Sequence, residues 1–164
     1  MMDRRLLLSG LLATGLAGCG FAPRREPELH IRSLGLQGFK PDSPLAAEFK
    51  RQLARTPVRL QEDFNKADVV LEARRDHRHK IVVVSTSAGQ VREWELRLDV
   101  DYLLRTPAGE VLLPLTELRL MREMNYTEST ALAKEQEEAL LFRAMQSDAV
   151  AQIMRRLSAV RLSN

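Results

Sequence analysis

The stretch that decides the fold reads EWELRLDVDYLL, from Glu93 to Leu104. Apolar or aromatic residues alternate with charged residues along most of its length. Successive side chains of a strand point to opposite faces, so this alternation predicts a strand with one buried face and one wet face. The stretch is also longer than the roughly five or six residues of a typical strand. The other predicted elements are arranged around it.

Three further strands are predicted on either side of this stretch. Residues 30–36 predict a first strand, residues 67–85 a second strand that contains a bulge, and residues 115–126 a fourth. A short extended piece is expected at residues 58–60. Turn signals separate the last three strands at Ser87-Ala88-Gly89-Gln90 and Pro107-Ala108-Gly109-Glu110.

Two amphipathic helices complete the pattern. The first is expected to begin at Ser43-Pro44, where serine can cap the helix and proline can occupy its first position. The second is expected over residues 132–160. Each carries one apolar stripe at helical spacing, formed by Leu45, Phe49 and Leu53 in the first and by Leu141, Met145, Ala149, Ile153 and Leu157 in the second.

The predicted order of elements is β-α-β-β-β-α. A helix between the first two strands makes them parallel, and the tight turns make the remaining pairs antiparallel. The expected fold is therefore α/β, more narrowly α+β. It is a two-layer sandwich in which two helices pack on one face of a four-stranded mixed sheet. The uncovered face should be polar on the third strand and mixed on the fourth.

The start of the chain carries an export signal. Arg4 and Arg5 precede an apolar run over residues 6–16, and the run ends in Leu16-Ala17-Gly18-Cys19, which contains the only cysteine. A basic start, a short apolar run and small residues before a cysteine are typical of a bacterial lipoprotein signal peptide. The run is about half of the ~20 residues that a membrane-spanning helix needs. An ordinary signal peptide with an accidental cysteine, or a short buried helix, remains the alternative.

These features divide the chain into three parts. Residues 1–18 are predicted to be the signal peptide, residues 19–28 a lipidated tether, and residues 29–164 a single periplasmic domain. Gly20 favours the outer membrane, because aspartate at this place is the common signal for retention at the inner membrane. The only expected prosthetic group is the covalent lipid on Cys19, which inserts into outer-membrane lipid. Aromatic residues make up 5% of the chain, which argues against a nucleic-acid surface built on base stacking.

No catalytic constellation is visible, so the chain is not expected to be an enzyme. His77 and His79 are two residues apart and could share one face of a strand, as metal ligands do. The only cysteine is expected to carry the lipid, and Arg75, Arg78 and Lys80 beside the histidines would repel a cation. No metal site is therefore predicted.

Several short pieces carry a family resemblance when taken in order. They are Cys19-Gly20-Phe21, the run from Ala67 to Leu71, the run from Gly89 to Leu96, Arg122 with Tyr126, the run from Ala131 to Glu137, and the helix end from Ile153 to Leu157. Their order and spacing resemble the LptE family of lipopolysaccharide-assembly lipoproteins of Gram-negative bacteria. The chain departs from many members at Ala22-Pro23-Arg24-Arg25, just after the lipid attachment site.

The resemblance implies a concrete role. Members of this family plug the lumen of the outer-membrane β-barrel LptD, support its assembly and bind lipopolysaccharide during delivery to the cell surface. They are not enzymes, and they fold as two helices on a four-stranded mixed sheet. The alternative is a periplasmic adaptor lipoprotein that binds another envelope protein and no glycolipid.

Two groups of basic residues are candidates for binding lipopolysaccharide phosphates. The first is the cluster Arg74, Arg75, Arg78 and Lys80, which could equally be a solvated extension of its strand. The second is Arg119 with Arg122. Arg119 ranks above the cluster because the resemblance ties a basic residue at this position to lipopolysaccharide binding. Arg122 falls in the apolar phase of its strand, where a charge needs a partner or a barrel wall. Met121 is expected to lie exposed beside Arg119, as suits a protein or lipid partner.

Overall fold

The protein was analysed as a computed structural model that describes residues 28–162. The predicted signal peptide, Cys19 and nearly all of the tether lie outside these residues. The elements are β1 (Ser33–Gln37), α2 (Pro44–Leu53), β2 (Arg59–Leu60), η1 (Phe64–Lys66), β3 (Val69–Ser85), β4 (Val91–Arg105), β5 (Val111–Asn125), η2 (Glu128–Thr130) and α3 (Ala131–Ser158).

The sheet has the order β2-β1-β3-β4-β5 and is mixed, as predicted. β1 is parallel to β2 and β3, whereas β3, β4 and β5 are successively antiparallel. The prediction of four strands is wrong by one, because the short piece after α2 pairs with β1. This strand, β2, has only two residues, which is too short for any periodicity to show in the sequence.

Two strand ends also differ from the prediction. β1 begins at Ser33 because the carboxylate of Asp68 accepts hydrogen bonds from the backbone N–H groups of Arg32 and Ser33, at 2.7 and 3.1 Å. β5 begins at Val111 and contains Pro114. An edge strand tolerates proline, because the missing N–H group would otherwise face solvent.

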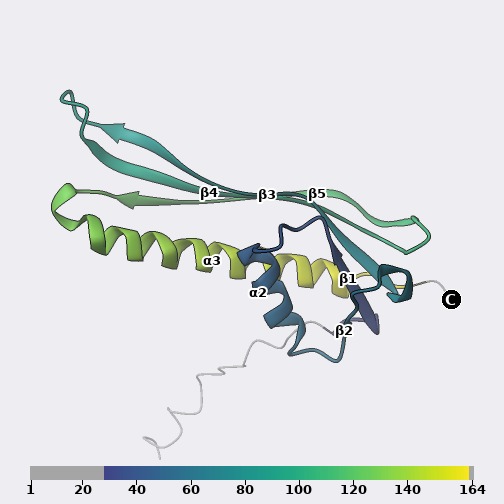
Figure 1. Ribbon diagram of the computed structural model, residues 1–164. Helices are drawn as coiled ribbons and strands as arrows, with labels where there is room; N and C mark the ends of the chain where they lie inside the picture. Colours follow the sequence, from purple (N-terminus) through teal and green to yellow (C-terminus); the bar gives the residue numbers. More distant parts are fainter. Residues whose placement is uncertain (1–27, 163–164) are drawn as a thin grey trace, which may run out of the picture.

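Both helices cover the same face of the sheet, and the opposite face is open (Figure 1). The covered face of β4 forms the centre of the core, since five of its side chains are 0% exposed: Leu96, Leu98, Val100, Tyr102 and Leu104. The predicted alternation is therefore confirmed. The long strands also extend well beyond β1 and α2, which gives the domain an elongated shape (Figure 1).

The helices begin and pack as their sequences predict. The Ser43 hydroxyl accepts a hydrogen bond from the N–H group of Ala46 at 3.0 Å and thereby caps α2. The α2 stripe and most of the α3 stripe are buried in one core cluster, namely Leu45, Phe49, Leu53, Met145, Ala149, Ile153 and Leu157.

Gly38, directly after β1, is expected to be sensitive to substitution. Its φ is +80°, and a Cβ atom built there would lie 2.1 Å from the carbonyl oxygen of Ala73. Gly109 has φ +95° but open space around it, so it is a matched control for the backbone strain alone. Gly38→Ala should lower the free energy of unfolding by about 1–3 kcal/mol more than Gly109→Ala, because overpacking adds to the strain. Urea unfolding followed by circular dichroism measures both, and equal losses would contradict the predicted clash.

Candidate functional site

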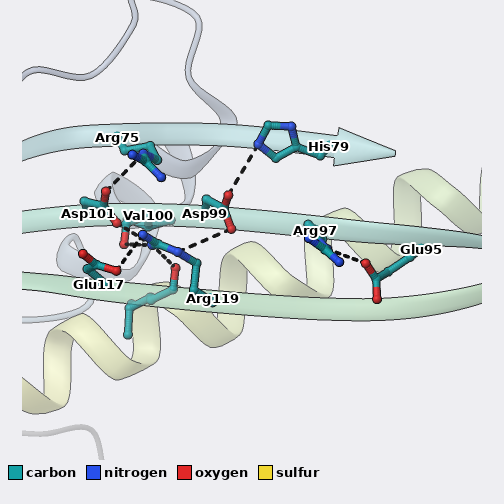
Figure 2. Close-up of polar contacts among 10 residues, drawn as sticks. Arg75, His79, Glu95, Arg97, Asp99, Val100, Asp101, Glu117 and Arg119 are labelled. Carbon is teal, nitrogen blue, oxygen red and sulfur yellow. Dashed lines mark hydrogen bonds and ion pairs between the residues drawn. The ribbon is translucent and has the colours of Figure 1, made fainter. Parts of the chain in front are cut away.

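A network of ion pairs runs across the open face of the sheet (Figure 2). At its centre is Asp101 on β4, whose side chain is only 9% exposed. Its carboxylate pairs with Arg75 of β3 at 3.1 Å and with Arg119 of β5. Arg119 also contacts Glu117 at 2.9 Å and Asp99 at 3.7 Å. Three neighbouring strands are therefore tied together by charged side chains.

The positive charge of Arg119 is therefore already paired with carboxylates of the protein itself. The hydrogen bond to Asp101, together with the nearby charges of Glu117 and Asp99, raises the pKa of the Arg119 guanidinium above its ordinary value. Three carboxylates surround this one guanidinium group, and Arg75 offsets part of their negative charge through Asp101. An anionic ligand that approaches Arg119 must compete with these carboxylates.

The histidines of β3 lie on the same open face. His77 and His79 stack with their ring centroids 6.0 Å apart, and Nε2 of His79 lies 3.5 Å from a carboxylate oxygen of Asp99. Within residues 28–162 there is no group of three or more potential ligands that could hold a metal ion.

The predicted basic cluster on β3 does not form one surface. Arg75 lies opposite Asp101 on the open face, whereas Arg78 and Lys80 lie opposite Leu98 and Leu96, which belong to the helix-covered face. A bulge between Ala73 and Arg75 sets this phase. The pleat of the strand alone separates Arg75 from Arg78 and Lys80, because these are three and five residues further along, and the bulge decides which of them lies on the open face.

The side chains that point toward the helices have partners on α3. Lys80 forms an ion pair with Glu138 at 2.5 Å, and its ammonium group lies 4.6 Å from the centroid of the Trp94 ring. The guanidinium group of Arg78 lies 5.5 Å from the centroid of the Phe142 ring. Both basic side chains therefore hold the first half of α3 against the sheet.

A second basic surface lies between β5 and α3, and we call it the β5 hollow. It has a volume of about 450 Å³ and is lined by three arginines, Arg119, Arg122 and Arg155, together with Met121 and Asp148. Both predicted β5 arginines line the hollow, but from opposite faces of β5: Arg119 lies opposite Asp99 on the open face, and Arg122 lies opposite Leu96 on the helix-covered face. Met121 is 54% exposed between them, as expected from the sequence.

The arginines of the β5 hollow differ in how they are paired. Arg122 contacts Asp148 of α3 at 3.0 Å and so has a charged partner, as its place in the apolar phase predicts. Arg155 has no ion pair within the described part of the chain. Asp148 and Arg155 are not among the predicted site residues, although Asp148, Ala151, Gln152 and Arg155 follow each other at helical spacing beside the buried stripe.

No helix within residues 28–162 is long and apolar enough to cross a membrane.

Comparison with known proteins identifies a family and a fold. A family model described as "LptE: Lipopolysaccharide-assembly" matches residues 31–157. The LPS-assembly lipoprotein LptE of Photorhabdus laumondii is 31% identical over 156 residues, which cover 94% of this chain and 85% of the relative. An uncharacterized lipoprotein B from Nitrosomonas europaea, solved by NMR, has 29% identity and a TM-score of 0.71, over 85% of this chain and 91% of that one. A minor lipoprotein from Acinetobacter baumannii has 25% identity and a TM-score of 0.65, over 81% and 94% of the two chains.

Proposed function

This chain belongs to the LptE family of lipopolysaccharide-assembly lipoproteins, and we propose that it plugs and helps assemble the LptD β-barrel in the outer membrane. In this proposal it also binds lipopolysaccharide on its way to the cell surface. It carries out no catalytic step. The lipid on Cys19 anchors it to the periplasmic side of the outer membrane.

The open face of the sheet supports the role of a plug. The lumen of an outer-membrane barrel is polar, so a protein inside it needs a polar surface. The face formed by Arg75, Asp99, Asp101 and Arg119 is charged, and its charges are largely paired with one another. Such a surface tolerates a hydrated, polar lumen without exposing an apolar sheet face to water.

The β5 hollow is the observation that carries the proposal of lipopolysaccharide binding. Guanidinium groups match phosphate oxygens with two parallel hydrogen bonds, and the lipid A part of lipopolysaccharide carries phosphates next to acyl chains. Arg122 and Arg155 supply cations, and exposed Met121 supplies an apolar contact from the open face of the β5 edge. Arg119 contributes less than these two, because three carboxylates already surround it.

Charge reversal in the β5 hollow tests this site. Arg122→Glu combined with Arg155→Glu should weaken binding of purified lipopolysaccharide about tenfold or more, because two charge-assisted contacts are lost. Surface plasmon resonance on the lipidated protein in detergent measures the change. The control is Arg32→Glu, whose side chain is 90% exposed and lies on a different part of the domain. Equal binding by the double variant and the control would remove the hollow as the site.

Asp148→Asn should strengthen lipopolysaccharide binding, whereas the charge reversal should weaken it. The substitution to Asn releases Arg122 from the one carboxylate that pairs with it within residues 28–162 and should leave the fold intact, since both side chains are about half exposed. Exposed ion pairs contribute up to about 1 kcal/mol, so lipopolysaccharide binding should tighten by up to about fivefold. A purely structural role for the pair would produce no tightening.

Co-purification separates the plug from the alternative of an adaptor without glycolipid recognition. Extraction of the lipoprotein in mild detergent should recover the LptD barrel in equal amounts. Recovery of a different envelope protein, and no barrel, would favour the adaptor.

A further inference from the structure

We propose that the outer edge of β3, from His77 to Ser85, binds an extended segment of the partner protein, which adds to the sheet as a further strand. This inference rests on the proposed barrel partner and names the contact by which that partner is held. We call this stretch of backbone the β3 edge.

The β3 edge is left without a neighbouring strand by the topology. β1 pairs with β3 only from Leu34 to Gln37, against Val69 to Glu72, whereas β3 continues for thirteen residues beyond Glu72. The loop after β1 stays close as far as Asp76, whose carboxylate accepts a hydrogen bond from Ser43 at 2.5 Å. In the part of the chain that the structure describes, no strand lies beside β3 on this side after that point. At about 3.3 Å per residue, the β3 edge is roughly 30 Å long.

A hollow lies beside the first part of this edge. Its volume is about 730 Å³, and its walls are β3, the loop that precedes α2, and the first half of α3. The ion pair of Lys80 with Glu138 and the packing of Arg78 on Phe142 fix the distance between β3 and α3. An unpaired strand edge on one side and a helix on the other form the kind of groove in which extended peptides bind by strand addition.

The side chains of the β3 edge specify the occupant. Residues 74–80 read RRDHRHK, and their only acidic residue, Asp76, is already bound to Ser43. Beyond them, the apolar run from Ile81 to Val84 is 40–53% exposed. Lys80 is already paired with Glu138, whereas Arg78 has no ion pair within residues 28–162. A complementary strand therefore carries carboxylates opposite His77 and Arg78 and apolar residues opposite residues 81–84.

The same charges disfavour a second copy of this chain as the occupant. Two antiparallel β3 edges would bring basic residues of one copy against basic residues or the apolar run of the other, and like charges opposite one another are destabilising. Basic residues on edge strands commonly prevent such self-association. The other long edge of the sheet, on β5, contains Pro114, which lacks an N–H donor. The β3 edge is therefore the better site for an added strand.

Hydrogen exchange of backbone amides tests the proposal directly. Every second N–H group of the β3 edge faces away from β4 and should exchange quickly in the lipoprotein alone. In the purified lipoprotein–barrel complex, these alternate amides between His77 and Ser85 should exchange at least about tenfold more slowly, because an added strand supplies their acceptors. If a stable complex forms and the exchange of these amides is unchanged, strand addition at the β3 edge is wrong, but the proposed function still stands. Failure of the lipoprotein to co-purify with the barrel would overturn the proposed function, and this inference with it.

Substitutions at one position test the charge of the occupant. His77→Glu should reduce the fraction of lipoprotein that co-purifies with the barrel about threefold, because a carboxylate would face the carboxylates of the added strand. Its repulsion from Asp99, the cross-strand neighbour on β4, is measured separately by unfolding of the variant without the barrel. His77→Lys is the matched control and should preserve or increase that fraction. If Glu and Lys at position 77 have the same effect, or the reverse effects, the proposed acidic strand is wrong.

Discussion

Phe49→Ala is expected to lower the free energy of unfolding by about 3–5 kcal/mol. Phe49 is 0% exposed and lies in the middle of α2, in the same core cluster as residues of β4 and α3. Truncation removes apolar surface from the core and leaves a cavity that the rigid sheet beneath cannot close. Because small domains have free energies of unfolding of about 5–15 kcal/mol, this single change would remove a large part of the total stability. Guanidinium unfolding of the purified protein measures the loss.

Two other substitutions on α2 show whether the loss comes from the core. Phe49→Leu keeps most of the volume and should cost less than half as much. Lys50→Ala, on the exposed face of the same helix, should change stability by about 0.5 kcal/mol or less. A large loss in Lys50→Ala would indicate that α2 itself, rather than its buried stripe, is the weak element.

The sequence predicts the elements of this fold well where periodicity is long. The alternation in β4 and the apolar stripe of α3 each extend over many residues, so the buried face follows from local pattern alone. β2 has no pattern, because its two residues pair with β1 only after α2 has brought the chain back beside it. The start of β1 depends on the side chain of Asp68, which is thirty-five residues away from Ser33. Such long-range contacts decide boundaries that local patterns cannot reveal.

The candidate site shows the same division. The exposed position of Met121 and a charged partner for Arg122 are expected from the phase of β5, and the structure shows both. The separation of Arg75 from Arg78 and Lys80 follows from their spacing, but which of them lies on the open face depends on one bulge in β3, and the sequence predicted a bulge without its position. Arg155 could be recognised only after α3 had been placed against β5. Whether these residues bind lipopolysaccharide stays a prediction.

Cys19→Ser is expected to abolish lipid attachment and, without the barrel, membrane association. The thioether bond of a lipoprotein requires the cysteine sulfur, and a serine hydroxyl does not replace it. Each buried methylene of an acyl chain contributes about 0.8 kcal/mol, so removal of all acyl chains removes the whole anchor. The variant should be exported with an ordinary cleavable signal peptide in place of residues 1–18. Radiolabelled palmitate incorporation and membrane fractionation measure the two losses. Gly20→Asp is the matched control, because it should keep the lipid and change only the destination to the inner membrane.

The same variant separates the anchor from the plug. If the domain is enclosed by the barrel, the interface with the barrel should hold it in place once the complex has formed, and the lipid mainly delivers and positions it. Unlipidated Cys19→Ser protein should therefore still join the barrel when overproduced, although less efficiently than the lipidated protein. Combining it with His77→Glu should then reduce barrel association further, because the lipid no longer compensates for a weakened interface. If barrel assembly depends wholly on the lipid, this prediction is wrong, and the lipid on Cys19 rather than the interface holds the protein at the barrel.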